Sequence, residues 1–526
     1  MLEKLSIKNF KAFSDWQELA LAPITLIYGP NSSGKSSIIH SIMLLKQSLT
    51  RPNLQGGLVS NGEYVDLGDF SSMVHGHDLK RDISFKFTYM PTKKQSYADL
   101  GFDVFGKSTQ REYDLTYKYH LITDSEDESG ASEIEKKRGF SYLDSMSAIV
   151  RTGETKEVLF STSIVSDLPN SLGPTEVRRL GLPTGKDVSV EKEPVETELS
   201  IKRKKSAKLI AAAKRFRFQD KSAWESVYTY LGNHKTKRQS GGKAETVRLL
   251  DSVSFKSDIN YATPSAVEVK TKIAQKDFDY DSHFQLNMAF SSLSRDLKEK
   301  FTSVSYLGPL RSHPSRFYAP KTDQNDSVGK QGENVAKFIY ERPEITDDIN
   351  KWFELFEVPY KLSSDGIGND VSGPVICLQL EDKRTGVMVG PSDVGFGIGQ
   401  MLPILVEGLV RDDSVICVEQ PEIHLHPRLQ AHLANFFVKT CKSNQWIIET
   451  HSESLMIRLQ NLIAAKEVTP SQIAIIYVEP TEDGGQIIPI RLDKEGDFID
   501  AWPEGFFEER LREKMGLPTN SWERSK

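Results

Sequence analysis

The chain has 526 residues, of which 38% are hydrophobic and 27% charged, and its formal net charge at pH 7 is −6. It contains no run of 18 apolar residues and its first residues do not form a signal-peptide pattern, so we expect no membrane association and no secretion. The three cysteines, Cys377, Cys417 and Cys441, form no C-x-x-C pair, which argues for a reducing cytoplasm and against a zinc site or a disulfide framework.

A glycine-rich segment at residues 28–37, Y-G-P-N-S-S-G-K-S-S, fits the pattern G-x-x-x-x-G-K-S without a gap. It follows an apolar strand expected at residues 24–28 and precedes a helix expected from Ser37 to about Gln47. In such a loop, backbone N–H groups surround a phosphate and the helix N-terminus adds its positive dipole end. The Lys35 side chain would reach the β- and γ-phosphates, and the Ser36 hydroxyl would ligate Mg²⁺. The pattern predicts an ATP site formed by Asn31, Ser32, Ser33, Gly34, Lys35, Ser36 and Ser37; the alternative is a Gly/Ser-rich turn with a surface lysine.

The remaining elements indicate one α/β domain that is split in the sequence. Short strands and helices alternate over residues 1–90, and apolar strand patterns return at 301–485, where continuous apolar runs are typical of parallel strands buried on both faces. Residues 91–300 lack this pattern, and we expect them to form an inserted lobe that is α-rich or mixed. Residues 486–526 form a C-terminal tail. A length of 526 residues agrees with such a division into two or three domains.

The predicted insert contains a strongly basic segment at residues 202–248. It has fourteen Lys and Arg against three Asp and Glu, a net charge of +11. The stretch Ala207 to Gln219 has helical spacing without breakers, and we expect the basic segment at about 202–248 to be helical. Such a segment could bind DNA by neutralising phosphates, although a charged helix in a large insert can also be a solvated face. Arg311 and Arg316, which follow a strand, are further candidates for DNA contact or for structural roles in a turn.

The strand expected at residues 415–418 ends in Glu419, which supplies the acidic group that a phosphate loop needs on the Mg²⁺ side. The string after it is E-Q-P-E-I-H-L-H-P at 419–427, and another strand ends in E-T-H-S at 449–452. For His424 and His426, packing or dimer contacts are the preferred interpretation over metal binding.

These motifs resemble ABC-type AAA family ATPases of the SMC/RecF/OLD-like branch. The resemblance rests on I-K-N-F-K-A-F at 7–13, the phosphate loop, and the strings at 418–427 and 449–453. The strings D-K-E-G-D-F at 493–498 and W-P-E-G-F-F at 502–507 resemble the DUF3696 tail. The resemblance covers roughly residues 1–90 and 300–510 and implies an ABC-type P-loop ATPase head of α/β class.

The resemblance implies roles for several residues. Glu419 matches the Mg²⁺-side acid, and His451 matches the switch histidine that senses the γ-phosphate. The segment S-D-V-G-F-G-I-G-Q at 392–400 stands where the family has its signature loop, which grips the γ-phosphate of the opposite subunit. Ser392, Gly395 and Gly397 would make this contact, which implies a homodimer, or a higher homo-oligomer, closed by ATP. The family's glutamine after the first helix has only weak candidates in Gln47 and Asp66.

One departure from the family pattern affects the chemistry. The glutamate that usually follows the Mg²⁺-side acid is Gln420 here. An amide can orient a water molecule but cannot accept its proton, so general-base catalysis of about 10²–10⁴-fold would be missing. We therefore expect an ATPase that hydrolyses ATP slowly and acts as a nucleotide-gated clamp.

Standalone ATPases with this tail resemble the ATPase subunits of Septu and retron-type anti-phage defence systems, where an HNH-type nuclease is a separate subunit. The resemblance implies antiviral defence, with DNA contacted through the basic insert. Two alternatives remain open: a RecF-like DNA repair or recombination ATPase, and a nucleotide-gated scaffold that does not need hydrolysis.

Overall fold

A computed structural model of the protein describes residues 1–50, 57–91, 109–121, 139–152, 158–166, 197–201, 235–240, 243–248, 253–257, 267–271, 296–319, 327–369 and 373–503. These residues fall into two compact units. The parallel-sheet unit contains Leu19–Ile39 and the described residues from Ser303 onward, together with Met1. The antiparallel-sheet unit contains Leu2–Glu18 and the described residues of His40–Thr302.

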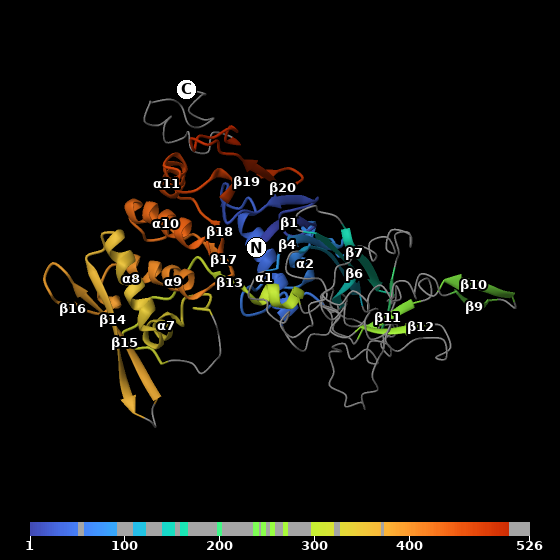
Figure 1. The fold of residues 1–526 in the computed structure, drawn as a ribbon, viewed down its shortest axis with the longest axis horizontal. Coiled ribbons are helices and arrows are strands. Elements are labelled where there is room, and N and C mark those ends of the chain that lie inside the picture. The colour runs from blue at the N-terminus through green and yellow to red at the C-terminus, as the bar shows by residue number, and fades with distance from the viewer. Residues whose placement is uncertain are drawn as a thin grey trace, which may run out of the picture. The chain divides into compact units, whose positions relative to one another are not determined.

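The parallel-sheet unit is built on a six-stranded sheet with the order β13-β17-β18-β3-β19-β20 (Figure 1). All neighbouring strands are parallel except the last pair, β19 and β20. The strand β3 comes from the N-terminal part of the chain and lies between two strands from the C-terminal part. The strands are β3 (Ile24–Tyr28), β13 (Val304–Leu307), β17 (Val415–Glu419), β18 (Gln445–Glu449), β19 (Ile473–Thr481) and β20 (Gly484–Ile490).

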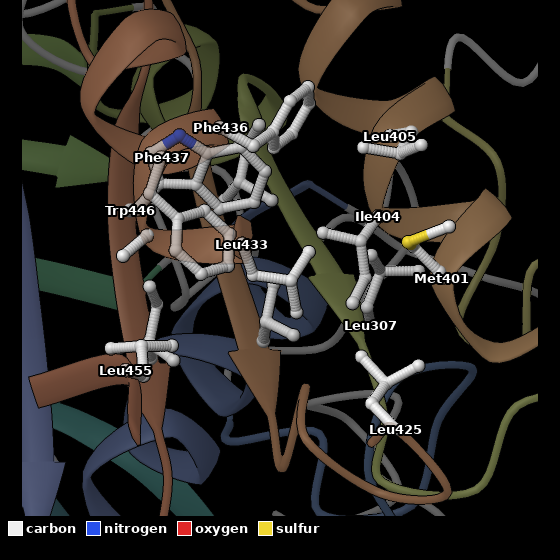
Figure 2. Packing of buried hydrophobic residues seen from close by; sticks show 14 of the residues in the cluster. Leu307, Met401, Ile404, Leu405, Leu425, Leu433, Phe436, Phe437, Trp446 and Leu455 are labelled. Carbon is white, nitrogen blue, oxygen red and sulfur yellow. The ribbon is translucent and has the colours of Figure 1, made fainter. Parts of the chain in front are cut away.

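A hydrophobic core joins one face of this sheet to its helices (Figure 2). Alternate strand residues such as Leu307, Ile416 and Ile448 are fully buried in it, because successive side chains of a strand point to opposite faces. The Trp446 ring packs at 4.8 Å from the Phe437 ring. The helices of this unit are α7 (Val335–Glu341), α8 (Pro343–Leu355), α9 (Phe396–Val410), α10 (Pro427–Thr440) and α11 (Glu453–Ala464).

Helix α10 and helix α11 begin at side-chain caps that the sequence supplies. The Ser452 hydroxyl accepts from the backbone N–H of Leu455 at 3.1 Å, and His426 Nδ1 accepts from the N–H of Arg428 at 3.3 Å. Pro427 occupies the first turn of α10, where its missing N–H is tolerated. Smaller elements of this unit are the sheet β14 (Tyr360–Asn369), β15 (Gly373–Asp382) and β16 (Met388–Val389), and the 3-10 helices η6 (Pro391–Asp393) and η7 (Pro470–Gln472).

The antiparallel-sheet unit contains a nine-stranded sheet with the order β12-β11-β8-β7-β6-β5-β4-β1-β2. Its aromatic core includes Phe87, whose ring lies 5.6 Å from that of Tyr113 and 5.2 Å from that of Phe301. The fully buried Arg111 forms an ion pair with Asp296, which neutralises a charge in this core. The strands are β1 (Leu2–Lys8), β2 (Gln17–Ala20), β4 (Ile83–Tyr89), β5 (Thr109–Leu121), β6 (Gly139–Thr152), β7 (Val158–Ser166), β8 (Thr197–Ile201), β11 (Val253–Ser257) and β12 (Val267–Thr271).

Helix α1 (Lys35–Thr50) starts in the parallel-sheet unit and ends in the antiparallel-sheet unit. The short helices α2 (Phe70–Met73) and η1 (His75–His77) follow it. None of the helices in the described ranges is long and apolar enough to cross a bilayer.

The mixed α/β architecture predicted from the sequence is confirmed, including a sheet assembled from both ends of the chain. The helical description of the basic segment 202–248 does not hold for two of its stretches, since β9 (Lys235–Ser240) and β10 (Lys243–Arg248) pair as an antiparallel hairpin. Ala207–Gln219, where the helical spacing was strongest, lies outside the described residues, as do residues 504–526 of the tail.

Candidate nucleotide-binding site

The loop at residues 29–34 connects β3 to the start of α1 and has a backbone that glycine makes possible. Gly29 has φ 147°, and a Cβ atom built on it would lie 2.4 Å from the carbonyl oxygen of Val478 on β19. No other residue fits this position. Ser32 also has a positive φ of 63°, while Ser37 donates its N–H to the Gly34 carbonyl at 3.0 Å. The turn between β3 and α1 therefore depends on glycine at position 29 and on left-handed backbone at Ser32.

Lys35 is the first residue of α1 and is only 5% exposed. Its ammonium group donates a hydrogen bond to the carbonyl oxygen of Pro30 at 2.6 Å, so the side chain folds over the loop. Burial lowers the pKa of Lys35, and the negative charge of Glu449 opposes this effect. A buried cation at a helix start, beside backbone N–H groups, is suited to a polyanionic ligand.

Glu419 is the last residue of β17 and is 5% exposed. Its Oε1 accepts a hydrogen bond from the Tyr306 hydroxyl at 3.0 Å. Burial, followed by the Glu419 charge, raises the pKa of Tyr306 well above its ordinary value, so the phenol remains a donor to the carboxylate. In the register of the sheet, Glu419 stands opposite Glu449, the last residue of β18.

Arg311 holds the backbone at the end of β17. Its Nη2 donates to the carbonyl oxygen of Glu419 at 2.8 Å and to that of Gln420 at 3.4 Å. The side chain is 6% exposed, and burial lowers its pKa to about 10 although Glu422 and Glu419 oppose this shift. Arg311 therefore has a structural role, which corrects its interpretation as a DNA contact.

Arg316, the other arginine considered for DNA, is exposed and forms an ion pair with Asp393. The bond from Arg316 Nη1 to Asp393 Oδ2 measures 3.1 Å. This pair ties residues 308–318 to η6 at the beginning of the predicted signature loop.

The segments after β17 and β18 are bonded to each other. Gln420 adopts φ 45° and donates its N–H to the Glu449 carbonyl at 2.7 Å. The Glu422 carboxylate accepts from the Thr450 hydroxyl and from the backbone N–H of His451, both at 2.7 Å. Glu422 was not among the candidate site residues expected from the sequence. The string E-Q-P-E alone gave no signal of this contact.

His451 lies in the half-buried segment between β18 and α11. Burial lowers its pKa, and the positive charge of Lys35 lowers it further. The structure thus brings Lys35, Glu449 and His451 within electrostatic range of one another.

The predicted signature residues lie around the start of α9. Gly395 is the residue before the helix, and Ser392 belongs to η6. A Cβ on Gly397 would lie 3.2 Å from the His424 carbonyl oxygen, and a Cβ on Gly399 only 2.2 Å from Pro314 Cγ. Gly397 therefore lies against the segment after β17, and Gly399 lies against residues 308–318 of the same chain, whereas a Cβ on Gly395 would meet nothing within 4 Å.

Three further residues considered from the sequence are His426, His424 and Gln47. His426 serves as the cap of α10, and His424 is exposed with φ 60°. The buried Gln47 bonds through both ends of its amide to the backbone of Val65, at 3.2 Å each, and so holds a neighbouring loop. Among the described residues there is no group of three or more His, Cys, Asp or Glu side chains arranged to hold a metal ion.

The oxygen groups near the loop do fit a Mg²⁺ ion that is shared with phosphate. Mg²⁺ is bound in such sites by one or two carboxylates together with substrate phosphates. Ser36, which follows Lys35 in the first turn of α1, carries a hydroxyl, and Glu419 carries a buried carboxylate at the end of β17, which β18 separates from β3.

The comparisons with known proteins agree with a P-loop ATPase. The family described as AAA ATPase domain matches residues 1–456, and the chain belongs to this family of ATPases. No protein of curated function matches the chain.

Among solved structures, the SMC head bound to the C-winged helix domain of ScpA aligns with a TM-score of 0.38 and 10% identity over 94% of this chain and 98% of that one. The SMC head domain from Thermotoga maritima gives a TM-score of 0.32 and 11% identity over 93% and 99%. The head with an extended coiled coil from Pyrococcus furiosus gives 0.39 and 11% over 93% and 96%. At these values the likeness supports no inference, and the fold rests on the strand order described above.

Proposed function

We propose that the protein is an ATP-gated clamp, which binds Mg·ATP at the phosphate loop, closes as a dimer around it and hydrolyses it slowly. One observation carries this proposal. The phosphate loop follows β3, the segment containing His451 follows β18, and Glu419 is the last residue of β17, so all three lie at the C-terminal ends of strands in the order β17-β18-β3. Ligands of open α/β sheets bind at this edge.

Within one copy, each group has a distinct task. Lys35 leaves the Pro30 carbonyl and binds the β- and γ-phosphates, while backbone N–H groups of residues 31–37 surround them. Ser36 and Glu419 would hold Mg²⁺, which neutralises phosphate charge when it is bound. His451 contacts the γ-phosphate from a segment that Glu422 fixes in place.

The second copy would complete the site. The start of α9 offers free backbone N–H groups near Gly395 and Gly397, which form an anion site at a helix N-terminus. A Cβ on Gly395 would meet nothing within 4 Å, so this end of the helix leaves room for the phosphate of a partner. Ser392, in η6, stands beside them.

Gln420 supports slow turnover. It follows Glu419 directly, but its amide cannot accept a proton from an attacking water. Its backbone is fixed by the bond to Glu449 and by Arg311. Slow hydrolysis would give a long-lived closed state that signals to a partner.

We further propose that the clamp controls a separate nuclease in anti-phage defence, with nucleic acid contacted through the basic segment 202–248. The support is the resemblance of the motifs to such ATPase subunits and the net charge of +11 in this segment. Co-purification from cells followed by mass spectrometry tests the partner: recovery of a nuclease supports it, and recovery of replication proteins favours the RecF-like alternative.

The clamp itself is tested by the molar mass of the protein with and without Mg·ATP, using light scattering after size-exclusion chromatography. The wild type is expected to double its mass with Mg·ATP. Lys35→Ala is expected to keep the molar mass of the nucleotide-free protein when Mg·ATP is added. The matched control is Lys466→Ala, which changes an exposed lysine and should double its mass as the wild type does. A mass that does not respond to nucleotide would contradict the clamp.

A further inference from the structure

Two glutamates lie side by side at the edge of the parallel sheet. Glu419 ends β17, Glu449 ends β18, and the two residues are direct partners in the parallel register. Both are buried, with Glu449 only 4% exposed. Because paired residues of neighbouring strands point to the same face, both carboxylates lie on one face of the sheet. Val418 and Ile448, the preceding residues, point into the hydrophobic core on the other face.

The same edge carries the phosphate loop. Glu449 pairs on its other side with Ile27 of β3, two residues before Gly29. Glu449 thus stands between the strand that leads into the loop and the strand that ends in Glu419. Glu449 was not among the site residues expected from the sequence, although it precedes His451 by two positions.

Lys35 is a cation within electrostatic reach of Glu449. The Glu449 charge raises the pKa of Lys35 against the lowering effect of burial. Glu419 has a different environment, since the Tyr306 hydroxyl donates to its carboxylate at 3.0 Å. Arg311 donates to backbone carbonyls in this region.

Nucleotide binding would change the charges that surround Glu419 and Glu449. When Lys35 turns to the phosphates, two buried carboxylates face a polyphosphate with less positive charge available to them. Buried charges without a compensating cation are strongly unfavourable. A divalent cation placed between the carboxylates and the phosphates removes this penalty, and Mg²⁺ prefers oxygen ligands of this kind.

We propose that Glu449 is a second carboxylate of the Mg²⁺ site, which acts with Glu419 to hold the metal when ATP is bound. This inference rests on the proposed nucleotide site and adds a residue to it. It explains why a buried glutamate, within electrostatic reach of Lys35, follows the three apolar residues of β18.

The test separates metal binding from nucleotide binding. The dissociation constant of a fluorescent ATP analogue is measured in EDTA and at saturating Mg²⁺, and their ratio gives the coupling between metal and nucleotide. Glu449→Gln keeps the side-chain size but removes the charge. The coupling is expected to fall about 10- to 100-fold, the range found when metal-site partners are removed. Binding in EDTA is expected to stay equal or become tighter, because a negative charge near the phosphates is gone.

The controls distinguish the possible failures. Glu467→Gln, an exposed glutamate between α11 and η7, should leave both constants unchanged. Glu449→Asp keeps the charge and should retain at least tenfold more coupling than Glu449→Gln. A coupling unchanged in Glu449→Gln, or equal losses of binding with and without Mg²⁺, would overturn this inference and leave the nucleotide site standing. Absence of ATP binding in the wild type would instead refute the proposed function.

A measurement without variants gives an independent answer. In a crystal structure of the wild-type protein with Mg²⁺ and a non-hydrolysable ATP analogue, the Glu449 carboxylate should lie within contact of the metal or of a water bound to it. A Glu449 carboxylate separated from the metal and from all of its waters would overturn the inference.

Discussion

The Glu422 carboxylate accepts a hydrogen bond from the backbone N–H of His451, with 2.7 Å between Oε1 and the nitrogen. Its other oxygen accepts from the Thr450 hydroxyl at the same distance. Glu422 follows β17 and His451 follows β18, so this carboxylate locks together two segments that come after different strands. In the proposed site it fixes the distance between the Mg²⁺-side acid and the residue that contacts the γ-phosphate.

Glu422→Ala is expected to impair hydrolysis more than folding. The change leaves the half-buried His451 N–H without its acceptor, which costs about 1–3 kcal/mol. If most of this appears as misplacement of His451, kcat falls about tenfold or more, since ~1.4 kcal/mol in the barrier is tenfold in rate. Steady-state ATP hydrolysis and a thermal melt measure the two effects, with Glu467→Ala as the exposed control. Unchanged kcat would mean that His451 is held by other contacts.

The contrast between Glu419 and Glu422 shows what the sequence could and could not predict. Glu419 ends a run of four apolar residues, and this local pattern located the strand, its end and the carboxylate correctly. The partners of Glu422 are about 28 residues away, as in the bond to Thr450, and no local periodicity encodes such a contact. Arg311 is similar: its sequence context left DNA contact and a structural role in a turn open, and only the fold shows its guanidinium buried against the end of β17.

The environment of His451 predicts a pH dependence. Burial and then the charge of Lys35 lower its pKa below the ordinary 6.5, so the imidazole is neutral at pH 7. Below pH 6.5 the unfolded chain takes up a proton that the folded chain does not. His451 therefore reduces the stability of the fold as the pH falls through 6.5 toward its folded pKa, and has no such effect above 6.5.

Nuclear magnetic resonance titration of the His451 ring measures this pKa directly. Lys35→Met should raise the midpoint because the positive charge is lost, while Lys35→Arg should leave it low. The resonance is assigned by comparison with His451→Gln. A His451 midpoint that is the same in Lys35→Met and the wild type would show that burial alone sets the shift.

The start of α9 offers a matched set of glycine substitutions. A Cβ on Gly399 would lie 2.2 Å from Pro314 Cγ, whereas a Cβ on Gly395 meets nothing within 4 Å. Gly399→Ala is expected to destabilise the fold by about 1–3 kcal/mol through overpacking. Gly395→Ala should leave the melting temperature unchanged but weaken ATP-dependent dimerisation, because its methyl group would meet the partner's phosphate. Equal melting temperatures for the two variants would contradict the packing at Gly399.

Gln420→Glu tests the chemistry of the slow clamp. The residue directly follows Glu419, at a position whose backbone is held by Glu449 and Arg311 in a left-handed conformation with φ 45°. A carboxylate there can accept the proton of the attacking water, so single-turnover hydrolysis is expected to rise by up to about 10²–10⁴-fold. Gln420→Asn, which keeps the amide but shortens the side chain, is the control and should not accelerate hydrolysis. Because faster hydrolysis shortens the closed state, the lifetime of the Mg·ATP dimer should fall in parallel. A wild type that already turns over ATP at tens per second, with no gain from Gln420→Glu, would show that the proton has another acceptor.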